Sequence, residues 1–268
     1  MPPRNYSESG GSMARKLKMI VAGNLVKVVL YTAPEPRDTP RARAEKSRMT
    51  SAAQKAMNDK TARDKLEMLL AENFKGRDLF LTLTYRDADL PARLDGAKKL
   101  VRKFLRNLRE HYKARGLELR YIYTTEGKHG DHRLHHHLVI NATERDIEVL
   151  RSLWPYGDIV DLEYIGPRGY RTVAEYMTKE GVESRPVGAQ MWTGSKNIRK
   201  PKVVTRYVPN GTTLEIPLNC HILEKEEKRT EFGSYCYIKY YKIPNYWNEK
   251  EAQAAGEKYT PPPLLSYL

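Results

Sequence analysis

Two segments rich in strand-forming residues, LRYIYTTE (119–126) and LHHHLVIN (134–141), lie close together in the sequence. Only the polar, glycine-containing segment GKHGDHR (127–133) separates them. So short a connection is long enough for a second strand to return beside the first, but too short for the crossover that a parallel pair needs. The two segments therefore predict an antiparallel hairpin, and with it a fold built on an antiparallel sheet.

The elements around this hairpin extend the prediction. DLFLTLTY (78–85) alternates like a strand, with Phe80, Thr82 and Thr84 on one face, and residues 93–114 have the apolar stripe of a long amphipathic helix. The hairpin is followed by segments typical of a helix, a strand and a helix, at 143–154, 158–165 and 172–180. This order is not the regular alternation of a parallel sheet. It predicts an α+β fold, with a central antiparallel sheet, helices packed mainly on one face and the other face open.

The chain is expected to have three consecutive parts: a basic N-terminal extension over 1–70, a core over 71–185 and a β-rich C-terminal extension over 186–268 that packs on the core. In the first part, 19–33 has the pattern of a hairpin or strand entered through Gly23-Asn24, and 50–73 that of a helix. In the third part, the segments with strand composition are 203–208, 213–218 and 235–243.

The charge of the chain indicates its class of partner. Lys and Arg number 47 and Asp and Glu 33, which gives a formal net charge of +14. Residues 1–70 carry 14 Lys and Arg against 7 Asp and Glu, and residues 91–116 carry 9 against 2. Such a chain is attracted to polyanions. Nucleic acid is favoured over a membrane, because no segment approaches the ~20 apolar residues of a membrane span.

The remaining composition narrows the expected setting. The two cysteines, Cys220 and Cys236, form no C-x-x-C pair, which is typical of a protein in a reducing cytoplasm. The N-terminal residues have no apolar secretory segment. No G-x-x-x-x-G-K-[ST] motif occurs, so an ATP-driven motor is not expected on this chain. No small-molecule cofactor is expected either.

The histidine triplet at 135–137 is a candidate metal site. Side chains alternate along a strand, so His135 and His137 share a face and His136 points the other way, where a structural role is expected. Glu126 ends the preceding strand, and the hairpin would bring it alongside as an oxygen ligand. Two imidazoles and a carboxylate suit Mn²⁺ or Mg²⁺, and Zn²⁺ less specifically. The alternative is that these histidines are half-buried sheet residues.

Tyr176 and Lys179 form a candidate catalytic pair. They are three residues apart on the expected helix, so they share one face. A tyrosine phenol becomes a nucleophile when a metal fixes its target, and Lys179 would stabilise charge or handle a proton. The alternative is a chance match, because the chain contains 18 tyrosines. Tyr170 is a rival nucleophile.

Taken in order, FLTLTY (80–85), the histidines 135–137 and the YMTK segment 176–179 resemble the motifs of the HUH endonuclease family of plasmid and phage rolling-circle replication initiators. The resemblance extends over about residues 75–185. MWTGSKNIRKP (191–201) also looks like a stretch that follows the tyrosine helix in that family. His136 departs from the pattern, which has a hydrophobic residue there, and only one well-placed tyrosine is present.

The resemblance implies a metal-dependent tyrosine nickase. Single-stranded or hairpin origin DNA would lie on the open sheet face, with the metal on Glu126, His135 and His137. Tyr176 would form a 5′-phosphotyrosine link and leave a 3′-OH for a host polymerase, and a host helicase would open the duplex. The resemblance also implies that the protein works in the cytoplasm of a bacterial or archaeal host cell. The basic arm 34–48 would bind backbone phosphates, as would eight residues elsewhere in the chain: Lys98, Lys99, Arg102, Lys103, Arg106, Lys196, Arg199 and Lys200.

Two other functions fit the same residues. The first is a non-catalytic nucleic-acid-binding module, in which sheet aromatics stack on bases and the histidines are structural. The second is a single-tyrosine transposase of the HUH class, which has the same chemistry in another biological process. Trp192 fits either a base-stacking platform or a core position.

Overall fold

A computed structural model describes residues 14–33, 51–127, 133–142, 146–165, 169–179, 191–217, 220–230 and 233–243. The chain divides into two compact units. The central unit contains residues 41–201, and the terminal unit combines residues 1–40 with 202–268. The terminal unit thus brings together the two ends of the chain, a grouping that differs from the three consecutive parts expected from the sequence. The basic arm 34–48 lies outside the described residues.

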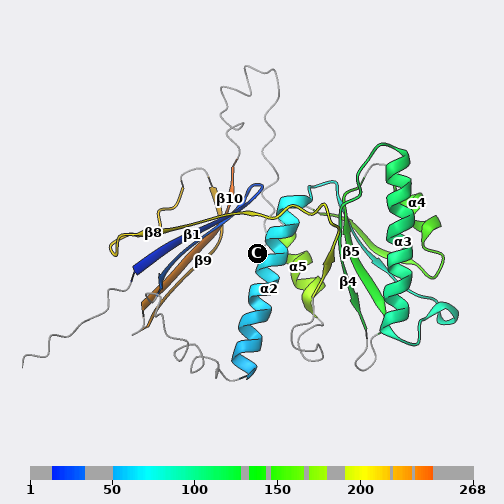
Figure 1. The fold of residues 1–268 in the computed structure, drawn as a ribbon, viewed down its shortest axis with the longest axis horizontal. Coiled ribbons are helices and arrows are strands. Elements are labelled where there is room, and N and C mark those ends of the chain that lie inside the picture. Colours follow the sequence, from blue (N-terminus) through cyan, green and yellow to red (C-terminus); the bar gives the residue numbers. More distant parts are fainter. Residues whose placement is uncertain are drawn as a thin grey trace, which may run out of the picture. The chain divides into compact units, whose positions relative to one another are not determined.

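The central unit contains a five-stranded sheet in the order β6-β3-β5-β4-β7, in which every neighbouring pair is antiparallel (Figure 1). The predicted hairpin is confirmed as β4 and β5, with Glu126 paired to His135. β3 lies on the other side of β5. The strands are β3 (Leu79–Leu83), β4 (Tyr121–Glu126), β5 (His135–Ile140), β6 (Ile159–Tyr164) and β7 (Thr193–Gly194).

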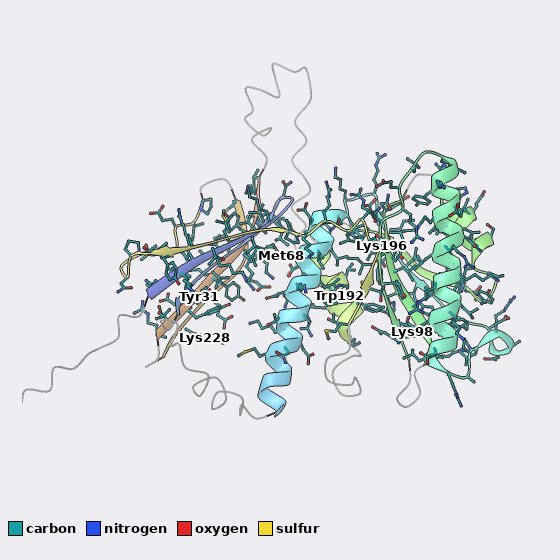
Figure 2. The ribbon with its side chains drawn as sticks, in the orientation of Figure 1. Tyr31, Met68, Lys98, Trp192, Lys196 and Lys228 are labelled. Carbon is teal, nitrogen blue, oxygen red and sulfur yellow. The ribbon has the colours of Figure 1, made fainter. Side chains whose placement is uncertain are left out.

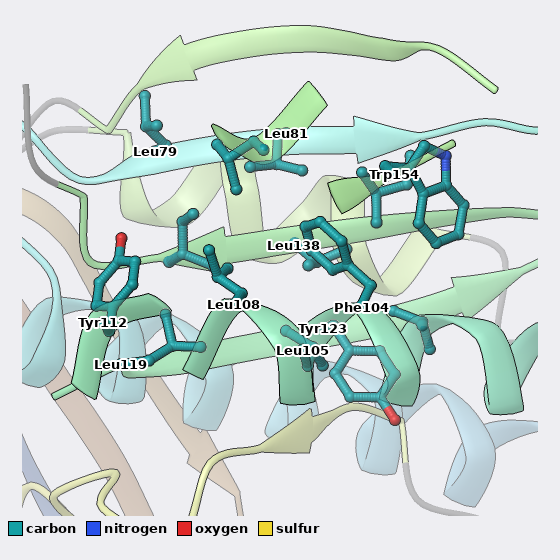
Figure 3. Close-up of a cluster of buried hydrophobic side chains, with 14 of the residues drawn as sticks. Leu79, Leu81, Phe104, Leu105, Leu108, Tyr112, Leu119, Tyr123, Leu138 and Trp154 are labelled. Carbon is teal, nitrogen blue, oxygen red and sulfur yellow. The ribbon is translucent and has the colours of Figure 1, made fainter. Parts of the chain in front are cut away.

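One face of this sheet packs on α3 (Leu94–Ala114) and α4 (Asp146–Leu153) (Figure 1). The apolar stripe of α3 meets alternate residues of β3, β4 and β5, and Figure 3 shows Phe104, Leu105 and Leu108 within this cluster. Trp154, just after α4, is fully buried in the same core. The short 3-10 helix Asp87–Asp89 precedes α3. Burial of this one continuous cluster therefore fixes the sheet against its helices.

The other face of the sheet, expected to be open, is instead partly covered by α5 (Tyr170–Thr178). Behind α5 lies α2 (Ser51–Asn73), and Figure 1 shows both helices on the side of the sheet opposite α3. Arg171 of α5 joins the two helices, since it lies 2.9 Å from Asp64 and 3.4 Å from Glu67. The α+β class and the antiparallel sheet are confirmed, but the helices lie on both faces.

The terminal unit is a second five-stranded antiparallel sheet, in the order β8-β1-β2-β10-β9. The N-terminal hairpin turns at Gly23, whose positive φ of 55° favours glycine. Both N-terminal strands are interior, and the edges of the sheet are β8 and β9. The strands are β1 (Ala14–Ala22), β2 (Leu25–Ala33), β8 (Lys202–Val208), β9 (Cys220–Thr230) and β10 (Gly233–Lys242).

Two features of the C-terminal region differ from the sequence prediction. The strand expected over 213–218 is absent from 213–217, the part of it that the structure describes. Leu214 packs there against the apolar cluster of the sheet, and Pro217 has no N–H for a ladder. Conversely, the strongly charged β9 has no obvious strand pattern, yet it pairs with β10 along most of its length. Among the described helices, none combines the length and apolar composition needed to cross a membrane.

Candidate active site

The hairpin brings together the three residues expected to bind a metal. His135 Nε2 and His137 Nε2 are 2.9 Å apart, and Glu126 Oε2 lies 3.7 Å from the first and 3.4 Å from the second. All the ligand atoms of this group lie within 4.8 Å of one another. Glu126 and His137 are buried and His135 is partly buried. The alternation of β5 and its register with β4 therefore create one compact donor group.

Hydrogen bonds from neighbouring groups orient both imidazoles. His135 Nδ1 donates to the backbone carbonyl of Arg133 at 2.7 Å, because a carbonyl can only accept. This tautomer leaves the Nε2 lone pair of His135 directed at His137. Nδ1 of His137 is 2.8 Å from the hydroxyl of Thr82 on β3. Partners of this kind on the far side of a ligand imidazole are what metal sites use to fix ring orientation.

The residues fit a divalent cation. Glu126 Oε1 is buried and has no hydrogen-bond partner among the described residues, which leaves a desolvated carboxylate oxygen beside two imidazole nitrogens. A cation between these donors would satisfy the carboxylate and both lone pairs together. The donor set of two nitrogens and a carboxylate accepts several divalent metals, Mn²⁺ and Mg²⁺ among them.

Tyr176 projects from α5 toward the same group. The centroid of its ring is 4.7 Å from that of His137, and its edge packs on Phe80, which in turn stacks on His137. Tyr176 is still 43% exposed, so its phenol is accessible. A cleft of about 260 Å³ opens here, and the residues that line it are Thr82, Thr84, Arg133, Leu134, His135, His137 and Tyr176.

The other two residues proposed for catalysis have different surroundings. Lys179 ends α5, where its backbone N–H donates to the carbonyl of Tyr176, but it is not among the described residues that line the cleft. Tyr170 is buried, and its hydroxyl donates to the carbonyl of Phe74 at 2.6 Å. Burial raises the pKa of Tyr170 to about 12. Tyr170 therefore joins α5 to the end of α2 and is not placed to act as a nucleophile.

His136 has the structural position expected of it. It is fully buried on the α3 face, with Tyr85 Oη 2.7 Å from Nε2 and Thr125 Oγ1 2.9 Å from Nδ1. Its ring also packs edge-on against Trp154. Burial lowers the pKa of His136 to about 3, so this imidazole is neutral. The motif position that departs from the family pattern is thus filled by a residue that the core accommodates.

None of the predicted DNA-binding residues is among those that line the cleft. Those on α3, including Lys98 (Figure 2), are on the outer side of a helix that packs on the opposite sheet face. Lys196, also labelled in Figure 2, follows β7, next to Ser195, whose N–H donates to the carbonyl of Tyr121. Tyr121 and Glu126 are at opposite ends of β4, about 17 Å apart along the strand. Contacts of these residues with DNA stay a prediction, and so does the role of the half-buried Trp192.

Arg133 and Thr82 are site residues that the sequence argument did not assign. Arg133 lines the cleft with a half-exposed side chain that donates to the carbonyl of Tyr85 and forms an ion pair with Asp87. It is the cation nearest the donor group among the residues that line the cleft. The alternation of β3 already placed Thr82 on the same face as Phe80. That pattern could have predicted that Thr82 lies on the site face of the sheet. Nothing in the turn composition marks Arg133.

Comparison with known protein families gives a match that covers the site. Residues 78–181 match the model of a family described as Replication-associated protein ORF2/G2P. This segment runs from the start of β3 to just beyond α5, and it contains Glu126, both metal-binding histidine candidates, Tyr176 and Lys179. No curated protein and no solved structure matches the chain.

Proposed function

We propose that this chain nicks and rejoins single-stranded DNA to start rolling-circle replication, because residues 78–181 match the model of the Replication-associated protein ORF2/G2P family. The observation that carries the proposal is the position of Tyr176. An accessible phenol lies beside a buried group of two imidazoles and a carboxylate, with 4.7 Å between the rings of Tyr176 and His137. A non-catalytic binding module has no need for that arrangement.

The reaction assigned to Tyr176 is a transesterification. The phenol of Tyr176 gives up its proton as its oxygen attacks the scissile phosphorus. The bond from phosphorus to the 3′ oxygen breaks, and that oxygen takes up a proton, so the step leaves a free 3′-OH with no net change in protons. The 5′ end stays linked to the tyrosine, so attack by a 3′-OH reverses the step and rejoins the strand. Packing against Phe80 and His137 holds the phenol of Tyr176 at the mouth of the cleft.

Glu126, His135 and His137 would hold a divalent metal, Mn²⁺ or Mg²⁺. When bound, such an ion supplies Lewis-acid polarisation and positioning of a phosphate. Thr82 and the carbonyl of Arg133 keep the two imidazoles turned toward one point. Arg133 has a half-exposed guanidinium at the cleft and would contact a phosphate of the bound strand.

The proposed partners follow from the products. The free 3′-OH is a primer end, so a host polymerase would extend it, and a host helicase would open the duplex ahead. The basic outer side of α3 and the residues after β7 lie away from the cleft. They would therefore contact DNA that flanks the nicked site. Binding through these contacts should weaken steeply as salt increases.

The test is a covalent-adduct assay with single-stranded origin DNA and Mn²⁺. We expect the wild-type protein to form a denaturant-resistant protein–DNA adduct, and Tyr176→Phe to form none while it still binds DNA. Tyr170→Phe is the matched control, because it removes another phenol from the same helix. That phenol is buried and donates to the carbonyl of Phe74. The variant should form the adduct at the wild-type level when folded.

An undiminished adduct in Tyr176→Phe would contradict the proposal and return Tyr170 to consideration. Absence of an adduct in the wild-type protein, together with firm DNA binding, would favour the non-catalytic module. Mapping the adduct by peptide mass spectrometry distinguishes these results, since it identifies the modified tyrosine directly.

A further inference from the structure

The terminal sheet has a line of five side chains that crosses all its strands on one face. Cross-strand pairs connect β8 to β1, β1 to β2, β2 to β10 and β10 to β9 at a single level. Directly paired residues point to the same face, and neighbouring strands are about 4.8 Å apart, so the line spans about 19 Å. Its members, called here the Tyr–Lys row, are Tyr207, Lys16, Tyr31, Tyr235 and Lys228.

The Tyr–Lys row is accessible. Tyr207 is 62% exposed and Tyr235 is 38% exposed, and Tyr31 is half-buried. Figure 2 labels two members of the row, Tyr31 on β2 and Lys228 on β9. Strand propensity accounts for tyrosines in β-strands. It does not account for three tyrosines and two lysines at one level of one face.

Cations accompany these rings. Lys16 Nζ lies 4.7 Å from the centroid of the Tyr207 ring. The next level of the same face adds Lys18 on β1 and Tyr237 on β10, whose ring centroid is 5.9 Å from that of Tyr235. Aromatic faces interleaved with ammonium groups form the surface on which unpaired bases stack while their phosphates meet positive charge.

The charge of the terminal unit is uneven across the sheet. Its described residues contain eleven Lys and Arg against four Glu, and three of those carboxylates are on the edge strand β9. One of them, Glu226, pairs with Lys228 at 2.6 Å. Strands β1, β2 and β8 contain no Asp or Glu. The face is therefore positive from β2 to β8, which suits a negatively charged partner, and the accessible tyrosine rings beside the lysines favour a polyanion that carries bases.

We infer that the Tyr–Lys row is a second binding surface for single-stranded DNA, separate from the cleft and outside the family-matched segment 78–181. Bases stack on Tyr207, Tyr31 and Tyr235, and phosphates contact Lys16 and Lys18. Stacking does not distinguish the bases strongly, so the row binds with little sequence preference. The choice of DNA over RNA rests on the proposed nicking function.

The experiment measures binding of the full-length protein to fluorescein-labelled oligothymidylate by fluorescence anisotropy. The Tyr176→Phe background excludes covalent capture and is shared by all variants. Tyr207→Ala and Tyr235→Ala should each weaken binding by about 5- to 100-fold. Lys16→Ala should lower the slope of log affinity against log salt by about one.

Two matched controls separate the row from general surface effects. Tyr164→Ala removes a tyrosine of similar exposure, 64%, from β6 of the central unit, and Arg206→Ala removes a cation from β8 on the face opposite Tyr207. Tyr164→Ala should leave the affinity unchanged, and Arg206→Ala should change it much less than Tyr207→Ala. Circular dichroism checks that each variant is folded.

The outcomes are distinct from those of the nicking test. Three results would overturn the inference and leave the nicking proposal intact. The first is unchanged affinity in both Tyr207→Ala and Tyr235→Ala, and the second is an equal loss of affinity in the two controls. The third is a loss of affinity for oligouridylate but not for oligothymidylate. With Tyr176 restored, the row variants should still form the adduct at saturating DNA. Loss of the adduct there, with oligothymidylate affinity unaffected, would also overturn the inference.

Discussion

The two five-stranded antiparallel sheets of this protein present polar side chains in opposite ways. In the central unit helices pack on both faces, so that Leu81 on one face and Thr82 and His137 on the other are each at most 3% exposed. In the terminal unit the Tyr–Lys row is partly accessible, with Tyr207 62% exposed. A side chain packed on all sides is held in one orientation, which metal binding and in-line chemistry require. An exposed row instead offers several weaker contacts that act nearly independently.

The sharpest way to test this contrast is to remove packing from each sheet in turn. Trp154→Ala should lower the free energy of unfolding by about 3–5 kcal/mol. The indole is buried against Tyr85 and Phe104, and its N–H donates to the carbonyl of Thr84. Tyr207→Ala in the terminal sheet should change stability by about 0.5 kcal/mol or less. Urea unfolding measures both values, and similar losses in the two variants would break the comparison.

A smaller effect is expected where a hydroxyl orients a metal ligand. Thr82→Val removes the hydrogen bond to His137 Nδ1 while it keeps the shape of the side chain. Mn²⁺ affinity, measured by isothermal titration calorimetry, should fall about 10- to 100-fold. Thr84→Val is the matched control, two residues further along the chain and just past the end of β3, because its hydroxyl bonds to the backbone of Asp158 rather than to an imidazole. Equal affinities in the two variants would show that Thr82 has no orienting role.

The smallest effect is expected for Tyr170, the buried tyrosine that the sequence analysis considered as an alternative nucleophile. Tyr170→Phe should cost about 1 kcal/mol through loss of the hydrogen bond to Phe74. The pKa of Tyr170 is raised to about 12, so the folded protein keeps a proton that the unfolded chain loses near pH 10. The stabilisation is therefore complete below about pH 10 and is lost as the pH rises toward 12.

Unfolding measured at about pH 8 and about pH 11 tests this sign. Wild type should lose more stability than Tyr170→Phe over that interval. An equal loss in both proteins would mean that the phenol of Tyr170 titrates alike in the folded and unfolded chains. Tyr176→Phe is a useful comparison in the same experiment. Tyr176 is 43% exposed in the folded protein, so unfolding changes the surroundings of its phenol much less than those of Tyr170.

Local patterns in the sequence predicted the central sheet well. Alternation placed Phe80 and Thr82 on one face and separated His136 from its two neighbours, and the short hairpin brought Glu126 opposite His135. These features depend on the two-residue period of a strand and on connection length, which are local properties. The pairing of Glu126 with the histidines was therefore predictable, together with their capacity to hold a metal.

Features that depend on long-range packing were not predictable from local patterns. α5 lies on the site face because it is joined to α2 and to the residue that follows it, far away in the sequence. Arg171 pairs with Asp64 of α2, and Tyr170 bonds to Phe74. The charged segment 220–230 forms β9 because β10 offers it a partner edge, and 213–217 has strand composition but no partner among the described strands. Arg133 reaches the cleft only through the path of a turn. In each case the environment, rather than the local composition, decides the outcome.

The order of β1, β2, β8, β9 and β10 in the chain has a consequence for biosynthesis. The N-terminal hairpin leaves the ribosome first, but its neighbours β8 and β10 are made only after the whole central unit, residues 41–201. Since domains fold as units while the chain emerges, we expect the cleft to form before the terminal sheet closes. A chain interrupted after the central unit would then hold a formed cleft but an unpaired β1–β2 hairpin with both its edges exposed. Such hairpins are prone to aggregate, so incomplete products of this protein should be selectively insoluble.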